Sequence, residues 1–571
     1  MTVKKLLNVV IPSLQLQIAP VIGYVFCLLV SFFYIAINDK NYVAEKPLVI
    51  LFGLGFSLLF FGIGQILAKY FSKYKESDTS LSRGAMIVLL TWMIACTISA
   101  LTFVVGGFPD PNNIESFSFF RKFVDGFYES MSGFTTTGSS ILNDVEAFPR
   151  SLLMWRSVTH LLGGMGIAYI GLTLLKKIFG KREEIINGEA ETHVIIGYKD
   201  EEEARESGFD FLKIYLLLTG VLILLLSISG YFFRQQSYSS WHENLYDSIY
   251  YSFSTMGTGG FAPYNASAGL NVTDPVTGKV FIGGLQNPVS EWIIAFFMLF
   301  AGANLAIWFD IIYKKNWKVA FSNLELKVYL GIISILTLVI GLNLKFSNTG
   351  YSIEEAFRYA FFNVTTVIST TGLGNADFAL WPALSQGLLF IVYLTGGMVG
   401  STAGGLKVIR FIVGFKYIFM EIRNLLLGVN KDRFEVDGVK YNRHSSGLII
   451  STIFLYFLIF FSGLILIMAT SPQVVFADGT IKSVDFVSAL SASIANLGNI
   501  GPAVAIGTVN AGPTGNYFAY SELTKIVMIF LMFIGRIGIL SFMLLFITHQ
   551  GDKELQLTEE HFDSDLPLLI R

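Results

Sequence analysis

Four short turns rich in glycine, threonine and asparagine interrupt strongly apolar stretches, and they hold the residues best suited to chemistry in this chain. Their last three residues are Thr136-Thr137-Gly138, Thr258-Gly259-Gly260, Thr370-Thr371-Gly372 and Asn499-Ile500-Gly501. Glycine reaches backbone angles that let successive carbonyl groups face one direction, and rings of carbonyl oxygens replace the hydration shell of potassium. One such turn alone would indicate close helix packing; four in one chain favour an ion pathway.

The fourth turn has two possible registers. When Gly501 is aligned with the other turn glycines, a serine lies eight residues before the glycine in three turns, at Ser130, Ser252 and Ser493, while Val364 breaks the series. The alternative places Gly498 in the turn and aligns Asp485 with aspartates of the first two turns. We expect the Gly501 register.

The composition limits the class of protein. The chain has 571 residues, of which 53% are hydrophobic and 14% charged, and its mean hydropathy is +0.59. These values exclude an ordinary soluble domain and predict a polytopic membrane protein. The only cysteines, Cys27 and Cys96, lie in apolar runs, so neither a disulfide framework nor a cysteine metal cluster is expected.

The apolar runs predict an all-α membrane fold with four pseudo-symmetric repeats around one central pore. Two runs, 18–37 and 47–68, precede the first turn and predict an N-terminal two-helix hairpin. The order span, short segment, turn, span then occurs four times, which gives about ten crossing helices and four re-entrant segments. The expected divisions are 1–80 for the hairpin, 81–182, 183–320, 321–425 and 426–550 for the repeats, and 551–571 for a cytoplasmic tail.

Basic residues supply an orientation. They cluster at 69–83, 176–182, 314–318 and 416–443, each after an even number of expected spans. Because positive charge is retained on the cytoplasmic side, both termini are expected in the cytoplasm. All four turns then open to the outside.

A second glycine-rich stretch interrupts the third return span. Residues 396–405 contain five glycines in ten positions, and each glycine costs a helix about 1 kcal/mol relative to alanine. We therefore expect a break in the helix there. Arg536 lies within the last apolar run, where an arginine is costly and functional by default, so we expect it to face the pore.

These motifs resemble the Trk/Ktr/HKT superfamily of potassium transporters, and most closely its bacterial TrkH/TrkG branch. The resemblance rests on Leu162 to Ile167, Phe253 to Phe261, Thr370 to Asp377 and Gly400 to Lys407, and it covers nearly the whole chain. It implies a selectivity filter at Gly138, Gly260, Gly372 and Gly501. It also implies a gate formed by an intramembrane loop and an arginine, here Gly400, Ser401, Thr402, Gly404, Gly405 and Arg536.

The resemblance further implies potassium uptake across the cytoplasmic membrane of a bacterium, with K+ as the transported ion and no organic cofactor. In this superfamily a serine at the first filter position goes with sodium transport, and this chain has Gly138 there. A glutamate that commonly follows the arginine motif is replaced by Gly538, which leaves the partner of Arg536 open. The implied partners are a second copy of this chain and a cytosolic nucleotide-binding regulatory subunit of the TrkA type, without nucleic acid. Two polar segments, 180–208 and 424–444, are the expected docking sites.

Two other classes of protein were weighed. A secondary cation symporter coupled to H+ or Na+ also uses broken helices, but it should bury a carboxylate or histidine at the midplane, and the spans show no clear one. An intramembrane enzyme needs a nucleophile with a base or a metal set, and the histidines are scattered. The channel-like pore is the main expectation and the symporter is the alternative.

Overall fold

The computed structural model describes residues 3–38, 43–71, 81–108, 117–170, 201–233, 240–269, 271–273, 280–282, 287–347, 350–471, 473–475, 480–505, 507–539 and 542. Three helices form the N-terminal part: α1 (Val3–Gln15), α2 (Ile18–Ile37) and α3 (Pro47–Tyr70). The first repeat contains α4 (Leu81–Gly106), α5 (Phe119–Phe134), a 3-10 turn at Val145–Ala147 and α6 (Arg150–Ile170).

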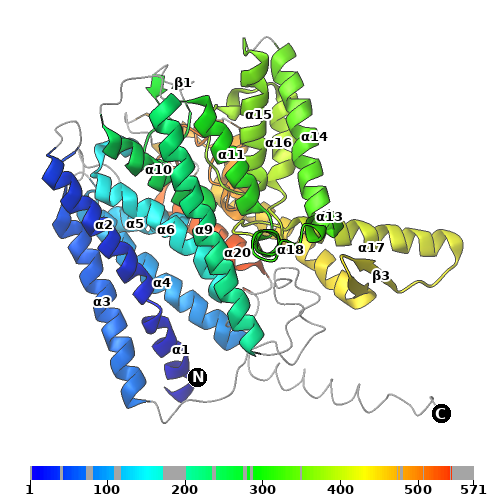
Figure 1. Cartoon of the computed structure of the whole chain (residues 1–571), viewed down its shortest axis with the longest axis horizontal. Helices are drawn as coiled ribbons and strands as arrows, with labels where there is room; N and C mark the ends of the chain where they lie inside the picture. The colour runs from blue at the N-terminus through cyan, green and yellow to red at the C-terminus, as the bar shows by residue number, and fades with distance from the viewer. Residues whose placement is uncertain are drawn as a thin grey trace.

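The remaining repeats follow in chain order. The second contains α9 (Glu201–Phe233), α10 (Trp241–Met256), α11 (Pro288–Gly302), α12 (Leu305–Ile312) and α13 (Lys318–Ser322). The third contains α14 (Leu324–Phe346), α15 (Ile353–Ile368), a 3-10 turn at Phe378–Leu380, α16 (Ala383–Tyr393) and α17 (Val408–Leu427). The fourth contains α18 (Arg443–Thr470), α19 (Phe486–Leu497) and α20 (Glu522–Ile537). The helices run side by side as a bundle, and α17 projects sideways from it (Figure 1).

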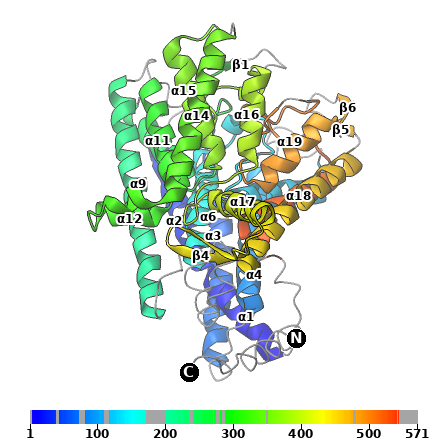
Figure 2. The same ribbon diagram turned by 90° about the vertical axis from the view of Figure 1, so that its right-hand side faces the viewer.

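Short hairpins accompany the helices. The strands β1 (Asn271–Thr273) and β2 (Val280–Ile282), β3 (Arg433–Val436) and β4 (Val439–Asn442), and β5 (Gln473–Val475) and β6 (Ile481–Ser483) form three antiparallel pairs. The β5–β6 hairpin lies near the start of α19, whereas β4 lies beside α17 on the lower side of the bundle (Figure 2). The predicted all-α fold is confirmed for the bundle. The prediction did not include the three hairpins in the loops. The expected boundaries after 320 and 425 fall inside α13 and α17.

The long helices agree with a polytopic membrane protein. Among the described residues, six helices are long and apolar enough to cross a membrane, or seven if α11 and α12, which meet at 104°, count as one span. This number is lower than the predicted total of about ten crossing helices because some of the return helices are interrupted. The third is broken between α16 and α17, and α20 ends at Ile537.

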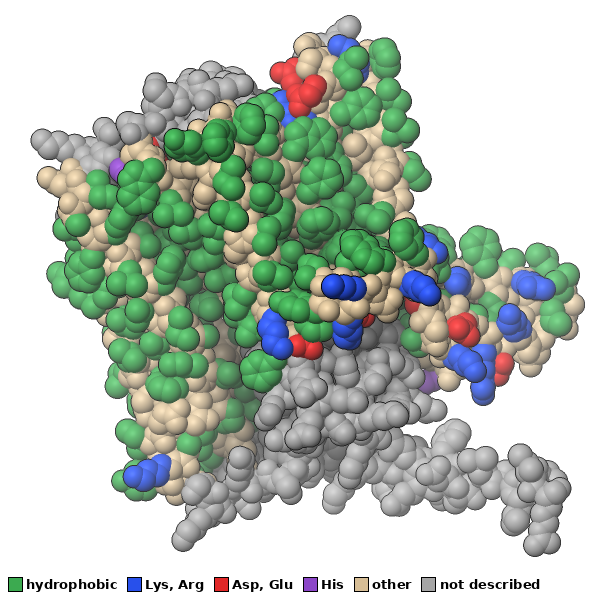
Figure 3. Space-filling view, viewed as in Figure 1, with side chains coloured by type: hydrophobic (Ala, Val, Ile, Leu, Met, Phe, Trp, Pro, Cys, Tyr) green, Lys and Arg blue, Asp and Glu red, His purple; other side chains and the backbone are tan. Residues whose placement is uncertain are grey.

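The outer surface of the bundle matches this composition. One face is broadly apolar, and Lys and Arg side chains gather near the level of α12, α13 and α17 (Figure 3). Exposed apolar side chains such as Leu48, Ile335 and Phe454 belong to the long helices. Such a surface is stable against lipid and not against water.

The shorter helices begin with local caps. Ser118 and Asp485 accept hydrogen bonds from the first-turn amides of α5 and α19, and Ser352 forms a capping box with Glu355 at the start of α15. These caps satisfy amides that have no partner within a helix. Three of the four short helices therefore start at positions set by their own sequence. Several predicted segments lie outside the described residues: most of 180–208, the end of the last span and the tail 551–571.

Candidate functional site

The four short helices α5, α10, α15 and α19 end in the same turn. Just beyond each helix lies a residue with left-handed backbone: Thr136, Thr258, Thr370 and Asn499, with φ of 51°, 51°, 54° and 52°. The amide of the next residue bonds to a carbonyl five residues back, at 2.8, 2.8, 2.8 and 3.0 Å in chain order. This is a Schellman helix end, in which glycine usually holds the left-handed position. Threonine is β-branched and strained in this region, and such strain clusters at functional sites.

Two residues after each left-handed residue, the chain has a glycine with positive φ. Gly138, Gly260, Gly372 and Gly501 have φ of 78°, 87°, 80° and 94°. Gly501 therefore holds the position equivalent to the other three. Gly498 is instead the C-cap of α19, and Asp485 is its N-cap, so the alternative register does not match the backbone.

The four turns form a closed ring in chain order. A Cβ atom on any of the four glycines would collide with a carbonyl oxygen of the next repeat. Gly138 lies against the carbonyl of Gly259, Gly260 against Thr371, Gly372 against Ile500, and Gly501 against Thr137. Because each contact leads to the next repeat and the fourth returns to the first, the four turns surround one axis. Only glycine permits this close approach.

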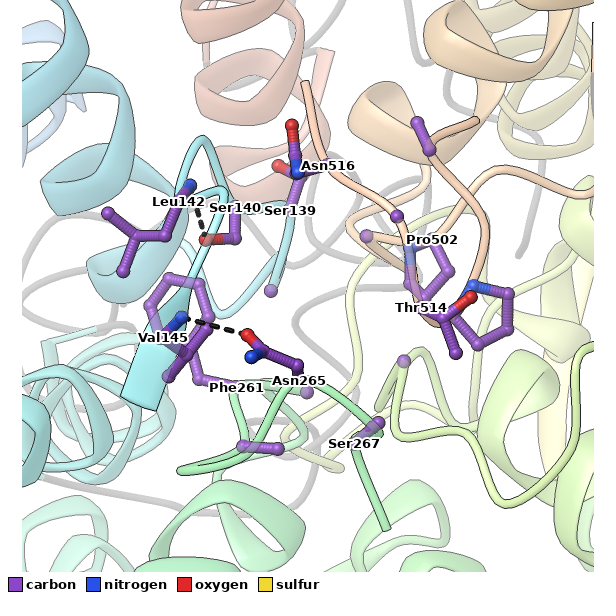
Figure 4. A pocket seen from close by; sticks show the side chains of 18 of the residues that line it. Ser139, Ser140, Leu142, Val145, Phe261, Asn265, Ser267, Pro502, Thr514 and Asn516 are labelled. Atoms are coloured by element: carbon purple, nitrogen blue, oxygen red, sulfur yellow. Dashed lines mark hydrogen bonds between the residues drawn. The ribbon is translucent and has the colours of Figure 1, made fainter. Parts of the chain in front are cut away.

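A cavity lies directly beside this ring. It has a volume of about 650 Å³, including the solvent space within it, and all four turn glycines line it. Ser139, Phe261, Asn265, Pro502 and Asn516 point toward it from different repeats (Figure 4). The cavity thus gives access to the ring from one side.

The glycine-rich stretch lies on the other side of the ring. It is non-helical from 395 to 407 and separates α16 from α17, and we call it the loop 395–407. Its amides bond to the carbonyls at the end of α11: Met398 to Gly302 at 2.8 Å and Thr402 to Ala301 at 3.3 Å. These carbonyls have no partner within their own helix, so the bend between α11 and α12 provides the seat for the loop.

Two threonines at the left-handed positions contact the loop directly. The hydroxyl of Thr258 donates to the carbonyl of Thr402 at 2.8 Å, and the amide of Gly404 donates to the hydroxyl of Thr370 at 2.7 Å. A Cβ atom on Gly404 would collide with the side chain of Asn499. The hydroxyl of Thr136 has no hydrogen-bond partner among the described residues. The loop therefore covers the face of the ring opposite the cavity, on the sides of the second, third and fourth turns.

The other predicted loop residues shape the loop itself. Gly400 and Gly405 have φ of 72° and 66°, and the carbonyl of Gly400 accepts from the amide of Leu305 at 3.0 Å. Ser401 donates its hydroxyl to the carbonyl of Met398 at 2.6 Å. The ammonium of Lys407 donates to the carbonyl of Ala403. Lys407 thus braces the loop that precedes it.

Arg536 contacts the loop from α20. Its guanidinium donates to the carbonyls of Thr402 and, at 3.2 Å, Gly163, and the residue is 6% exposed. α20 ends at Ile537, one residue after Arg536, and Gly538 follows with φ of 91°, while Ile539 and Phe542 are again helical. With glycine at 538, the partners of the guanidinium in the described residues are backbone carbonyls.

Buried carboxylates lie in the described residues of the short helices α5 and α10 and in the first turn of α11. Glu129 on α5 pairs with Arg156 on α6 at 2.8 Å, and Asp125 on α5 pairs with Lys525 on α20. Glu291 pairs with Arg358 in the same way, and Asp247 accepts from the hydroxyl of Tyr264 at 3.1 Å. Three of these carboxylates are neutralised by cations that lie up to 400 positions away in sequence, so no local sequence pattern identifies these pairs.

Glu325 is a further buried carboxylate that the sequence did not single out. It lies in the first turn of α14, is 5% exposed and accepts from the amides of Val399, within the loop, and Ile409, in the first turn of α17. A lone acid at the start of a span looks like an interfacial residue. Only its contacts distinguish it.

His160 is packed against the second turn. It is fully buried, and its ring stacks on Phe261 with 4.3 Å between ring centroids. Its Nδ1 atom lies 3.3 Å from the hydroxyl of Ser254. The ring also lies against Gly259, where it supports the backbone of the second turn.

Comparisons with known proteins agree with this architecture. Residues 60–556 match the TrkH family, described as cation transport protein. The Trk system potassium uptake protein TrkH of Escherichia coli K12 is 28% identical over 499 residues, which is 86% of this chain and 91% of that protein. TrkG of the same strain is 25% identical over 513 residues, 88% of this chain and 91% of that protein. The crystal structure of the potassium transporter TrkH from Vibrio parahaemolyticus superposes with a TM-score of 0.68 at 22% identity, covering 93% of this chain and 98% of that one.

Proposed function

This chain belongs to the TrkH family of cation transport proteins, and on that premise we propose that it takes up potassium through a channel-like pore. The relatives from Escherichia coli are named as potassium uptake proteins of the Trk system. The ring of four glycine turns carries the proposal, because it places carbonyl groups of four repeats around one axis. Carbonyl oxygens in such a ring replace the hydration shell of K+.

We assign the filter to three residues in each turn, from the left-handed residue to the glycine. These are Thr136, Thr137 and Gly138; Thr258, Gly259 and Gly260; Thr370, Thr371 and Gly372; and Asn499, Ile500 and Gly501. The C-terminal end of each short helix points its partial negative charge toward the same turns. This attracts a cation without placing a formal negative charge at the ring.

We assign the gate to the loop 395–407 and Arg536. The loop covers the face of the ring opposite the cavity through Thr402 and Gly404. The guanidinium of Arg536 beside the loop adds a positive charge that repels a cation. Conduction requires the loop to move away from this position. The structure in this interpretation is a closed one.

The same proposal includes orientation and partners. The band of Lys and Arg near α12, α13 and α17 (Figure 3) supports a cytoplasmic location for that level, with both termini in the cytoplasm of a bacterial cell. The exposed apolar side chains of α17, including Phe415, Phe419 and Leu425, suit contact with lipid or with a second copy. The β3–β4 hairpin within 424–444 is the described part of the docking surface for a nucleotide-binding subunit.

Flux through purified protein in liposomes tests the function. We expect rubidium, as a tracer for potassium, to move down its own gradient without any proton or sodium gradient. The buried carboxylates paired with Arg156, Arg358 and Lys525 favour this over the symporter, because a paired acid is a poor proton carrier. Strict dependence of rubidium flux on a second ion would establish the symporter instead, and absence of flux would overturn the assignment.

A further inference from the structure

One carboxylate oxygen binds the chain on both sides of the segment 402–404, the part of the loop that contacts the turns. The Oε1 atom of Glu325 accepts hydrogen bonds from the amides of Val399 and Ile409, both at 3.1 Å. These amides lie on either side of the segment that covers the filter ring, and they are 74 and 84 positions away from Glu325 in sequence. The charged acceptor makes each bond stronger than a bond between neutral groups.

The start of α14 is itself fixed in place by the β3–β4 hairpin. Asp437, at the tip of the hairpin, accepts from the amides of Leu324 at 2.6 Å and Glu325 at 3.2 Å. Its carboxylate thereby satisfies two first-turn amides and complements the positive end of the helix. The position of the Glu325 backbone is therefore set by a residue outside the bundle of long helices.

The hairpin is also attached to α17, the helix that follows the loop. The ammonium of Lys416 donates to the carbonyl of Glu435 at 3.2 Å, and Arg443 pairs with Glu421 at 2.9 Å. The hairpin thus bridges the helix that carries Glu325 and the helix that begins at Val408. Hydrogen bonds thus connect Glu325, the loop and the hairpin into one unit.

We propose that Glu325 is a positioning residue of the gate, which latches the loop in the closed position from both sides of the segment 402–404, and that Asp437 sets the latch. This rests on the proposed function, in which the loop is the gate. Opening the loop separates Val399 or Ile409 from a buried carboxylate, so the bonds to Glu325 oppose opening. A displacement of the hairpin would move Asp437, release the first turn of α14 and weaken the latch.

Two replacements of Glu325 separate acceptor from charge and size. Glu325→Gln keeps an Oε1 acceptor, and both bonds use that single atom, so it loses only the charge. Glu325→Leu keeps a similar volume but removes the acceptor, and loss of a bond to a charged group shifts an equilibrium by about tenfold. We expect basal rubidium flux in liposomes to rise about tenfold for Glu325→Leu and by a smaller factor, about threefold, for Glu325→Gln, because neutral bonds are weaker than charge-assisted ones.

Hydrogen exchange provides a readout that does not depend on transport. Amides of the segment 396–409 should exchange faster in Glu325→Leu than in the natural protein, while peptides from the filter turns stay unchanged. Asp437→Gly tests the hairpin without altering the bundle, since Asp437 has φ of 49°, a conformation that glycine adopts freely. It should raise both flux and exchange. Asp432→Leu removes an exposed carboxylate one residue before β3 and should change neither.

The outcomes distinguish the two proposals. If the natural protein carries rubidium and Arg536→Ala raises the flux while neither Glu325→Leu nor Asp437→Gly does, the latch is wrong and the pore stands. If the natural protein carries no rubidium, the proposed function fails, whatever the exchange data show. If Glu325→Leu is not recovered as monodisperse protein, Asp437→Gly decides: unchanged flux and exchange in that variant overturn the latch.

Discussion

The guanidinium of Arg536 and the hydroxyl of Thr258 donate hydrogen bonds to the same atom, the carbonyl oxygen of Thr402. One donor comes from α20 and the other from the second glycine turn. The loop 395–407 is therefore joined at one point both to the proposed filter and to the arginine. Any movement of Thr402 breaks both bonds together.

Removal of this arginine should open the gate. Arg536→Ala loses the donor to Thr402 and the positive charge beside the loop, and a hydrogen bond from a charged donor contributes about 1.5–3 kcal/mol. We expect basal rubidium flux to rise about tenfold, as it should when residues 400–404 are deleted. Arg423→Ala, an exposed arginine of α17, serves as the control. Unchanged or lower flux in a monodisperse Arg536→Ala protein contradicts the gate assignment.

The ion pair between Arg156 and Glu129, beside the cavity, leads to a second prediction. Arg156 lines the cavity, and Glu129 balances its charge from a fully buried position. Glu129→Gln retains the size of the side chain but leaves a positive charge near the path of the cation, where it repels K+. Rubidium flux should fall several-fold, and raised ionic strength should partly restore it because salt screens the charge.

The control for this prediction neutralises both members of the pair. Glu129→Gln combined with Arg156→Gln removes the excess charge, so its flux should lie above that of the single variant. If the double variant is as slow as Glu129→Gln while both remain monodisperse, the effect comes from packing and not from charge.

Features of this chain that depend on local chemistry could be predicted from the sequence. The four turns were found because the backbone of each needs glycine at one position and a short polar residue two positions earlier, as at Gly138 and Thr136. The break at 396–405 was found for the same reason. Glu325 and Glu129 were missed because their partners are 74 and 27 positions away, and no local pattern encodes such contacts.

Arg536 shows the intermediate case. Its burial followed from an arginine in an apolar run. Its place at the end of α20 did not, because the apolar residues after Gly538 continue the composition of a span. The positive φ of Gly538, and not hydropathy, ends that helix.

The cap of α19 predicts a dependence on pH. Burial raises the pKa of Asp485, but hydrogen bonds from the Ser488 hydroxyl and from the amides of Thr508 and Ser488 outweigh it and hold the pKa below its usual value. A lowered pKa in the folded state means that the carboxylate stabilises the fold above about pH 4, its unfolded pKa, and that this is lost as the pH falls through the lower folded value.

Asp485→Ala should therefore cost about 1 kcal/mol near pH 7, as loss of a helix N-cap does. Thermal unfolding of the purified protein, followed by size-exclusion chromatography, measures the difference. The melting temperatures of variant and natural protein should converge as the pH falls below about 4. A difference that stays constant down to the lowest tolerated pH contradicts a cap that depends on ionisation.

The first filter glycine gives the most specific prediction, because the chain contains a matched control. Gly138 and Gly350 both have φ of +78°, but a Cβ on Gly138 would collide with the carbonyl of Gly259, whereas one on Gly350 meets nothing within 4 Å. Gly138→Ser should therefore shift a ring carbonyl and lower the preference for rubidium over sodium in competition flux assays, on the order of tenfold, since a distortion worth about 1.4 kcal/mol gives that factor. Gly350→Ser carries the same backbone strain and should leave the preference unchanged. Equal preference in the two variants would remove Gly138 from the filter.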